Sequence, residues 1–393
     1  MTDHDVTDAD LLRKRVSAFV RDRVFPCESR LDAGGPVAKE LRERLRAEAR
    51  EAGLWALPLP SELGGGGLTL SAYTSLAEVE GASDHGPAAV GSASLLDVTM
   101  LSRHGSGRVR SDYLRHLVSG DLRTCYAMTE PDTPGTEPAL TATRAERRAG
   151  GGWSITGRKW FASNAGDADL VSVLARTSGS DGDRDGLSLF LVPTDSPGFR
   201  VVRELPVLGA TGQYEIEFEH VDVDEDQLVG EPGRALAVAG ERLQLGRILR
   251  ALRWIGQAQR AFDLMCERAT VRQGARAPLA DRQLVQQHVF EALLALRTTR
   301  PLVYEAMALV ADGRDARVEV GLAKTAAART LHQVADRAVQ VFGAAGLGPD
   351  TPLPALFRTG RTARILDGPD ELHVSSVARR VLRSRQGSAV TPA

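Results

Sequence analysis

A single carboxylate, Asp367, occupies the most informative position in this 393-residue chain. It lies in the stretch Arg361-Thr-Ala-Arg-Ile-Leu-Asp-Gly-Pro-Asp-Glu-Leu-His373, close to the C-terminus. Gly368 tolerates unusual backbone angles, and Pro369 disfavours the α region for the residue before it, so the chain must leave helix geometry here. A carboxylate fixed on a short turn can act as a base towards a molecule in front of it. An acidic helix cap is the alternative interpretation, because aspartate is common at helix ends.

The elements that must position this turn are long amphipathic helices. Two stretches after Ala235 carry apolar residues at steps of three and four, which is helical spacing. The first stretch contains Ile248, Leu252, Ile255, Phe262, Met265 and Ala269, and the second contains Val320, Ala323, Ala327, Leu331, Val334, Ala338 and Val341. Long helices in series predict a helical bundle.

The chain before this bundle changes character at about Thr124. Helices are expected over residues 10–24, 36–52, 70–81, 88–104 and 108–118, and the glycine run 64–67 is interpreted as a loop. Strands are expected over 153–160, 169–175, 187–192 and 214–220, with a polar hairpin loop over 179–186. In the last of these strands Tyr214, Ile216 and Phe218 alternate with glutamates, as in a half-buried strand.

These patterns predict a mainly α protein with a central β-domain of barrel or sandwich type and a C-terminal four-helix bundle. The predicted domains are an N-terminal helical domain (1–124), the β-domain (125–234), the helical bundle (235–385) and a tail (386–393).

Bulk composition excludes several classes of function. The formal net charge of −2 gives no basic field for nucleic acid. Three distant cysteines predict neither a disulfide nor a zinc site, and the eight histidines show no ligand spacing, so no metal is expected. We assign His332 and His373 to helix packing or to solvent. The polar N-terminus predicts no signal peptide, and no apolar run is long enough for a membrane span, so a cytoplasmic protein is expected.

Four ordered stretches, taken with the helices–strands–helices pattern, resemble the acyl-CoA dehydrogenase family of flavoproteins. They are Tyr126-Ala-Met-Thr-Glu-Pro131, Gly157-Arg-Lys-Trp-Phe-Ala-Ser163, Gln340-Val-Phe-Gly-Ala-Ala-Gly346 and the Asp367 turn. Without the resemblance, the first two fit equally well a strand that ends at a proline turn and a strand with aromatic side chains in the core.

The resemblance implies FAD as the cofactor. In the family the first stretch lies along the flavin ring, an aromatic like Phe161 covers one flavin face, and a hydroxyl like Ser163 lies near N5. An arginine at the position of Arg272 reaches the flavin of a neighbouring subunit, which makes a homo-oligomer, dimer or tetramer, the expectation. The implied cofactor residues are Tyr126, Met128, Thr129, Thr136, Phe161, Ser163, Arg272, Gln283, Gln340, Gly343, Ala344, Pro369 and Glu371.

This chain departs from the family pattern at three places. A Gly-Ser-Asp turn is usual where this chain has Asp132-Thr-Pro-Gly-Thr136, so Thr136 is the only matching hydroxyl. Phe-Gly usually follows the cofactor arginine, and Ala275-Arg276 stands there instead. Ala344 replaces the second glycine of a Gly-Gly pair. The sequence leaves open how Ala275 and Ala344 affect FAD affinity.

The base of this family has two known positions. Most relatives carry Glu-Gly-Thr where this chain has Asp367-Gly368-Pro369, and it resembles a smaller branch with Asp-Gly-Pro-Asp-Glu. The other position corresponds to Leu245-Gly-Arg247, which has no carboxylate. The resemblance therefore assigns the base to Asp367. It also assigns substrate contacts to Leu366, Gly368 and Arg247, with Arg247 at the CoA part, whereas Arg250 and Arg253 are expected to be plain surface residues.

The predicted function is FAD-dependent α,β-dehydrogenation of an acyl thioester, acyl-CoA to trans-2-enoyl-CoA. Asp367 removes the α-proton, the β-hydride passes to flavin N5, and an electron-transfer flavoprotein takes the electrons. A flavin oxidase or monooxygenase that uses oxygen directly is the alternative, in a biosynthetic pathway and on an acyl group held by a carrier protein. A non-catalytic role stays open as a third hypothesis.

Overall fold

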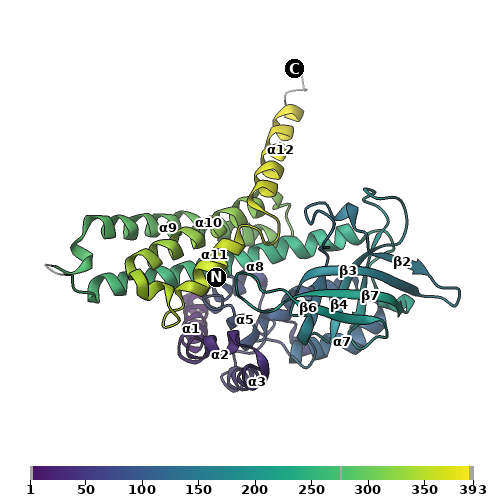
Figure 1. The fold of residues 1–393 in the computed structure, drawn as a ribbon, viewed down its shortest axis with the longest axis horizontal. Helices are drawn as coiled ribbons and strands as arrows, with labels where there is room; N and C mark the ends of the chain where they lie inside the picture. The colour runs from purple at the N-terminus through teal and green to yellow at the C-terminus, as the bar shows by residue number, and fades with distance from the viewer. Residues whose placement is uncertain (1–2, 275–276, 389–393) are drawn as a thin grey trace. The chain divides into compact units, whose positions relative to one another are not determined.

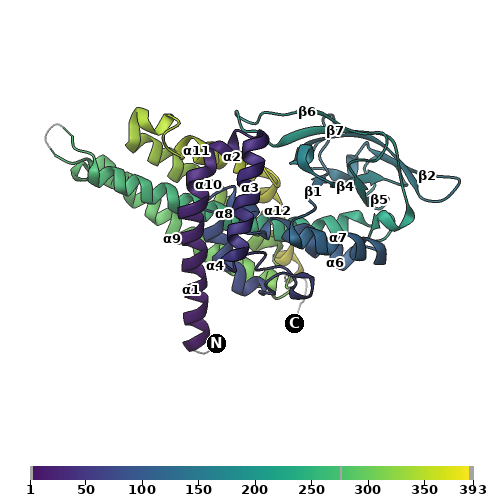
Figure 2. The same cartoon turned by 90° about the horizontal axis from the view of Figure 1, so that it is seen from below.

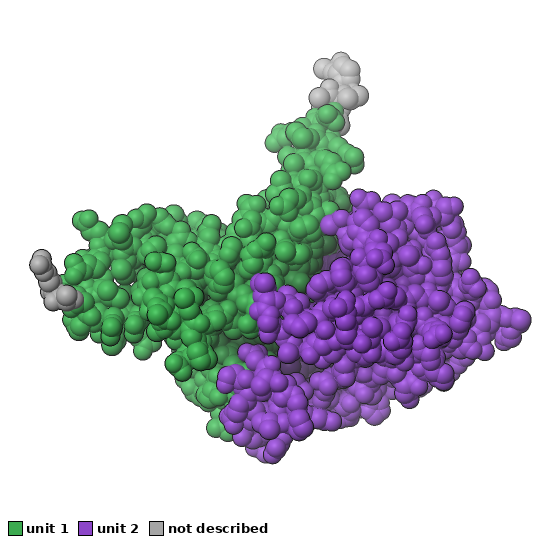
Figure 3. Space-filling view, in the orientation of Figure 1, with its two compact units in different colours: residues 1–28, 69–87, 244–393 green, residues 29–68, 88–243 purple. Residues whose placement is uncertain are grey.

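The computed structural model describes residues 3–274 and 277–388 (Figure 1). It contains two compact units, each assembled from segments that are separated in sequence (Figure 3). Unit 1 combines the chain up to Glu28, the segment Thr69–Pro87 and the chain from Gln244 onward. Unit 2 combines Ser29–Leu68 and Ala88–Leu243. The helices of the first 124 residues thus contribute to both units, and the three consecutive domains stay a prediction.

Unit 1 is helical. Its helices are α1 (Asp3–Phe19), α4 (Leu70–Glu80), most of α8 (Ala235–Val271), α9 (Gln283–Ala311), α10 (Arg317–Phe342), α11 (Leu353–Ala363) and α12 (Asp370–Ser388). Helix α10 contacts α9, α11 and α12, while α4 contacts α1 and α9 (Figure 2). All seven apolar residues of the stripe predicted between Val320 and Val341 are buried, so the core-facing side of α10 is confirmed.

Unit 2 combines a sheet with helices. Its helices are α3 (Gly35–Glu51), α6 (Leu95–His104) and α7 (Gly107–Ser119), with the short α2 (Glu28–Asp32) and α5 (Gly86–Ala89) at segment boundaries. The strands are β1 (Thr124–Ala127), β2 (Arg144–Arg147), β3 (Trp153–Ser163), β4 (Leu170–Arg176), β5 (Leu187–Pro193), β6 (Phe199–Glu204), β7 (Gln213–Val223) and β8 (Leu228–Val229).

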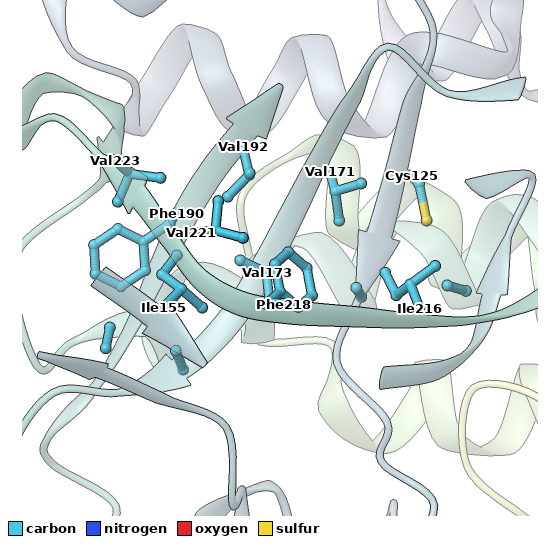
Figure 4. Close-up of a cluster of buried hydrophobic side chains, with 14 of the residues drawn as sticks. Cys125, Ile155, Val171, Val173, Phe190, Val192, Ile216, Phe218, Val221 and Val223 are labelled. Carbon is cyan, nitrogen blue, oxygen red and sulfur yellow. The ribbon is translucent and has the colours of Figure 1, made fainter. Parts of the chain in front are cut away.

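The eight strands form one sheet in the order β6-β7-β3-β2-β4-β5-β8, and β1 pairs in parallel with β4. A buried apolar cluster holds this sheet together (Figure 4). Within it Trp153 and Phe190 meet edge to face with ring centroids 5.6 Å apart. The pairing of β3 with β7 shifts register between Lys159 and Ala162, which marks a β-bulge in the predicted cofactor stretch.

The predicted fold class is confirmed, since helices precede and follow a central β-region. All four expected strands are present, and β4 and β5 pair antiparallel across the predicted hairpin loop. In β7 the alternation holds except at Glu215, which is buried beneath ion pairs to Arg158 and Arg203.

Two helix predictions need correction. The single helix expected over 88–104 is wrong: α5 and α6 are separate, because Gly91 takes a φ of +78° that interrupts the helix. The helix expected over 10–24 begins earlier, at Asp3, and changes to π-helix over Val20–Val24. In the described part of the chain, no helix is both long and apolar enough to cross a membrane.

Candidate active site

The Asp367 turn joins α11 to α12 within unit 1, as its Gly-Pro pair predicts. Asp367 has a φ of +55° and Gly368 a φ of +97°. Few residues other than glycine accept the left-handed region, although aspartate is among the more tolerant. Non-glycine residues in such conformations persist where surrounding contacts hold them, and they gather at functional sites.

The Asp367 carboxylate lies against an arginine. Its Oδ2 is 2.7 Å from Nε of Arg250 on α8, although this oxygen accepts no hydrogen bond in the described part of the chain. The side chain of Asp367 is 20% exposed and that of Arg250 is 39% exposed. The carboxylate is therefore partly open to its surroundings while a cation fixes one side of it.

Three further side chains hold the backbone of this turn. Arg247 Nε donates to the carbonyl oxygen of Asp367 at 3.0 Å, and His373 Nε2 lies 3.2 Å from the same oxygen. Lys324 Nζ on α10 donates to the carbonyl oxygen of Gly368 at 2.6 Å. Three different helices thus fix two successive peptide groups.

The charge states of these side chains follow from their burial. Burial lowers the pKa of His373 to about 4, and Arg247 and Lys324 add to that effect, so the imidazole is neutral at pH 7. A neutral His373 must carry its proton on Nε2 in order to donate to Asp367 O. Burial also lowers the pKa of Lys324 to about 8, so Lys324 is mostly protonated at pH 7.

The residues around the turn are also fixed. Asp370, buried at the first position of α12, pairs with Arg329 at 3.1 Å and Arg364 at 2.9 Å. Leu366 and Pro369 are half-buried, whereas Glu371 is exposed. Asp370 thus anchors the helix that follows the Asp367 turn.

Sequence reasoning missed three of the side chains that touch the turn. Arg250 was assigned to a plain surface, although it lies three residues after Arg247 and so on the same side of α8. His373 was assigned to packing or solvent. The sequence pattern by itself assigns no role to Lys324, although this lysine stands four residues after the core residue Val320, where a charge is unusual. A lysine within an apolar helix stripe is the sequence signal that indicates a special role for Lys324.

In unit 2, a buried ion pair supports the first predicted cofactor stretch. Lys159 Nζ lies 2.8 Å from Glu130 Oε1 and also donates to the carbonyl oxygen of Met128 at 3.1 Å. Glu130 accepts further hydrogen bonds from Ala142 N and from Thr143 N and Oγ1. Burial opposes the charge on Glu130, but Lys159 and these donors lower its pKa to about 2.

The neighbouring stretch places Phe161 in an unusual conformation. Phe161 sits in the β3 bulge with a φ of +49°, and its side chain is 44% exposed. Trp160 packs against its edge at 4.8 Å and donates its backbone N–H to Thr129 O at 3.0 Å. Ser163 exchanges hydrogen bonds with the Gln213 amide. The bulge therefore presents an aromatic ring outward instead of burying it.

Six of the other predicted cofactor residues lie at exposed positions, whereas Tyr126, Met128 and Thr129 are half-buried. Thr136 is exposed in the loop after β1. In unit 1, Gln283 begins α9, Gln340 lies in the last turn of α10, and Gly343 ends that helix with a φ of +65°. Arg272 and Ala344 are also exposed. Ala275, one of the departures from the family pattern, lies outside the described residues.

Comparison with known proteins gives a consistent result. Models of the acyl-CoA dehydrogenase N-terminal, middle and C-terminal domains match residues 7–121, 125–221 and 233–382. The Mycobacterium tuberculosis protein named "Probable acyl-CoA dehydrogenase FadE2" is 36% identical over 399 residues, which cover 97% of each chain. The chain belongs to the acyl-CoA dehydrogenase family. It is thus an oxidoreductase of the type that acts on CH–CH donors, as predicted.

Other relatives agree with this assignment. Human acyl-CoA dehydrogenase family member 11 is 32% identical over 395 residues, and the chain spans only 50% of that longer protein. A solved structure from Mycobacterium abscessus, provisionally assigned as an acyl-CoA dehydrogenase, has a TM-score of 0.89 and 33% identity, covering 96% of this chain and 98% of that one. Butyryl-CoA dehydrogenase from Megasphaera elsdenii has a TM-score of 0.86 at 24% identity, covering 97% of this chain and 99% of that one, and so shares the fold.

Membership of the acyl-CoA dehydrogenase family supports FAD as the cofactor, and the residues of unit 2 fit such a group. Phe161 offers an exposed ring face for stacking. Tyr126 Oη and Trp160 Nε1 are buried polar atoms with no hydrogen-bond partner among the described residues. Buried polar atoms normally have partners, so these two fit a bound molecule with a polar edge.

Proposed function

We propose that this protein catalyses FAD-dependent α,β-dehydrogenation of an acyl-CoA with Asp367 as the base. The observation that carries the proposal is the Asp367 turn. The carboxylate of Asp367 is partly exposed and projects from a left-handed backbone. Side chains from α8, α10 and α12 contact the carbonyl oxygens of that backbone. A helix cap needs no such support, so the arrangement favours a base.

The chemistry follows from what a carboxylate at this place can do. Asp367 accepts the proton from the carbon α to the thioester carbonyl, where loss of a proton is easiest. The bond between the α and β carbons becomes double as a hydride leaves the β-carbon, which gives a trans-2-enoyl thioester. FAD supplies the acceptor for that hydride. General-base catalysis of this kind contributes roughly 10²–10⁴-fold to a rate.

The chain's own residues orient the reactants. Phe161 would cover one face of the flavin ring system when FAD is bound, and Ser163 would offer a hydroxyl to the negative charge that arrives with the hydride. Tyr126, Met128, Thr129 and Thr136 would bind the polar edge of the flavin.

The residues of unit 1 complete the assignment. Gly343 has no atom within 4 Å of a position that a Cβ would take, so a dinucleotide can approach its backbone. The remaining cofactor residues are Arg272, Gln283, Gln340, Ala344, Pro369 and Glu371, and the substrate residues are Leu366, Gly368 and Arg247. Arg247 is already bonded to Asp367 O in this structure, so its role is to hold the base as well as to face the substrate.

The partners follow from the same proposal. The substrate is an acyl-CoA, and an electron-transfer flavoprotein removes the electrons. One structural relative, at 24% identity, is an electron transferring flavoprotein of Acidaminococcus fermentans. This likeness establishes the common fold, and the partner itself is inferred from the reaction. A homo-oligomer follows if Arg272 reaches the cofactor of a second subunit.

The decisive experiment is anaerobic bleaching of the flavin absorbance by a panel of acyl-CoAs. We expect one chain-length class to bleach the wild-type protein. Asp367→Asn should retain FAD and bleach about 10²–10⁴-fold more slowly. Asp315→Asn, at an exposed position just before α10, is the matched control and should bleach at the wild-type rate.

Two outcomes would contradict the proposal. An Asp367→Asn protein that bleaches at the wild-type rate excludes Asp367 as the base. A wild-type protein that no acyl-CoA bleaches, but whose reduced form air reoxidises within the mixing time, points to an oxidase or a monooxygenase.

A further inference from the structure

Two of the four lysines in this chain are completely buried, and their surroundings differ. Lys159 in unit 2 is paired with the carboxylate of Glu130 at 2.8 Å. Lys324 in unit 1 donates to the carbonyl oxygen of Gly368 at 2.6 Å, and in the described part of the chain no carboxylate lies within ion-pair distance of it. A buried cation normally has a direct counter-ion. Lys324 instead has the face of the Trp254 ring 5.8 Å from its Nζ and acts on Asp367 and Asp370 only from beyond ion-pair distance, so its hydrogen bond to Gly368 is its closest polar contact.

Lys324 belongs to a set of three donors on three helices. Arg247 on α8 and His373 on α12 approach the carbonyl oxygen of Asp367, and Lys324 on α10 approaches that of Gly368. These carbonyl oxygens belong to Asp367 and Gly368, the two residues of the turn that have a positive φ. A left-handed Asp-Gly pair is unfavourable without support, and its carbonyls face inward to the three donors. The set therefore fixes the backbone from which the base projects.

The start of α12 has ion pairs of its own, separate from these three bonds. Asp370 already anchors the start of α12 through Arg329 and Arg364. The α10 stripe around Lys324 is apolar, so a methionine of similar length would suit that side of the helix. The contacts that need the ammonium group of Lys324 are the hydrogen bond to Gly368 and a longer cation–π contact with Trp254, at 5.8 Å from the ring centroid, and only the hydrogen bond reaches the turn.

We propose that Lys324 is a positioning residue that holds the Asp367 turn in its left-handed conformation and thereby aims the base at the substrate. The inference rests on the proposed function. Lys324 does not touch the carboxylate, so it acts through the backbone of Gly368. Because misplacement of a reacting group by about 1 Å can cost roughly 10²-fold in rate, loss of this bond should be visible in catalysis.

The charged form of Lys324 gives a second readout. The groups that act on it are Arg247 on α8, Asp367 on the turn, and Asp370, Glu371 and His373 on α12. Burial lowers its pKa to about 8, with the carboxylates opposing that effect. Above pH 8 the amine of Lys324 loses its proton and becomes a weaker hydrogen-bond donor, so turnover should fall. An arginine at position 324 would stay charged, so this decline should be absent from Lys324→Arg.

The experiment compares Lys324→Met with Lys14→Met, the same substitution at an exposed lysine of α1. We expect Lys324→Met to bind FAD at the wild-type stoichiometry, to unfold within a few degrees of wild type, and to be reduced by the best acyl-CoA at least about tenfold more slowly. The acyl-CoA dissociation constant should change less than twofold. Lys14→Met should match wild type in every measurement.

A second variant, Lys324→Arg, tests the proposal even if Lys324→Met does not fold. Lys324→Arg retains its charge at every accessible pH, so the decline in flavin reduction above pH 8 should disappear in it. His373 does not titrate near pH 8, and Lys159 is present in both proteins, so neither disturbs this comparison.

The results separate this inference from the function on which it rests. If wild type is bleached and Lys324→Met is bleached equally fast, or if Lys324→Arg keeps the wild-type alkaline decline, the positioning role is wrong. Equal losses of stability, FAD content and rate in Lys324→Met would show a merely structural lysine and overturn it as well. If no acyl-CoA bleaches wild type, the proposed function itself has failed.

Discussion

The Nε atom of Arg250 lies 2.7 Å from the carboxylate Oδ2 of Asp367, and this pair defines how the candidate base meets its surroundings. Arg250 approaches the side chain, whereas Arg247, Lys324 and His373 approach the backbone of the same turn. Asp367 is therefore held at both its side chain and its peptide groups. The contact with the side chain and the contacts with the backbone lead to different predictions.

Replacing Arg250 should impair catalysis and leave stability nearly unchanged. Its side chain is 39% exposed, and pairs of this exposure contribute at most about 1 kcal/mol. Arg250→Met should therefore slow anaerobic flavin reduction by roughly tenfold through loss of orientation. Arg250→Lys should be intermediate, because lysine keeps the charge but not the planar fork. Arg253→Met on the same helix is the control, and an equal effect there would contradict the specific role of Arg250.

Gly368 should be irreplaceable for steric reasons. An added Cβ would lie 2.7 Å from Leu372 Cδ2 and 3.1 Å from His373 Nε2, and the φ of +97° would be strained. Gly368→Ala should lower the free energy of unfolding by about 1–3 kcal/mol and slow flavin reduction as His373 is displaced. Gly343→Ala is the matched control, since its φ is +65° but no atom lies within 4 Å of the added Cβ. Chemical denaturation of the two variants measures how much unfolding free energy is lost to the contacts with Leu372 and His373. Equal losses of unfolding free energy in Gly368→Ala and Gly343→Ala would exclude a steric effect at Gly368.

The Lys159–Glu130 pair should dominate the stability of unit 2. Lys159→Met leaves a buried carboxylate without its counter-ion and should cost about 3–5 kcal/mol of unfolding free energy. Arg144→Met, which removes an exposed pair with Asp181 at 2.7 Å, should change the free energy of unfolding much less, because solvent screens exposed ion pairs. Urea unfolding of both variants tests the contrast, and similar losses would show that burial of the pair is unimportant.

The same pair predicts how stability depends on acid. The pKa of Glu130 is lowered to about 2 from its ordinary value of 4.5, so the folded protein binds a proton on this carboxylate less tightly than the unfolded chain does. Its contribution is complete above about pH 5 and is lost as the pH falls towards 2. Glu130→Gln should therefore show a shallower loss of unfolding free energy between pH 5 and pH 3. An unchanged slope would contradict the assignment.

Substitution of Phe161 should lower the affinity for FAD without lowering the stability of the apoprotein. Phe161→Gly removes the ring and also relieves the φ of +49°, so apoprotein stability should not fall. FAD affinity should fall roughly fivefold, about 1 kcal/mol for a lost aromatic contact. Leu208→Gly is the control, because Leu208 has the same φ of +49° and is 63% exposed. Flavin fluorescence titration measures the affinity, and an equal loss in Leu208→Gly would remove Phe161 from the site.

Local chemistry explains what could be predicted from the sequence. The strands of unit 2 were found because side chains alternate with a period of two, and the α10 stripe because apolar residues recur at helical spacing. The Asp367 turn is predictable because Gly368 and Pro369 cannot continue a helix. The break at Gly91 was missed because an isolated glycine is tolerated within a helical pattern, and the structure alone reveals its positive φ.

The sequence by itself therefore determined the order of helices and strands, the identity of the base candidate and the family. Only the tertiary structure decided what surrounds the base. Arg247 and Asp367 are 120 residues apart and Lys324 and Gly368 are 44 apart, and periodicity states which face of a helix is buried but not which neighbour it meets. Asp367 thus stood out from its own turn, whereas Arg250, Lys324 and His373 gained their roles only when three helices packed around that turn.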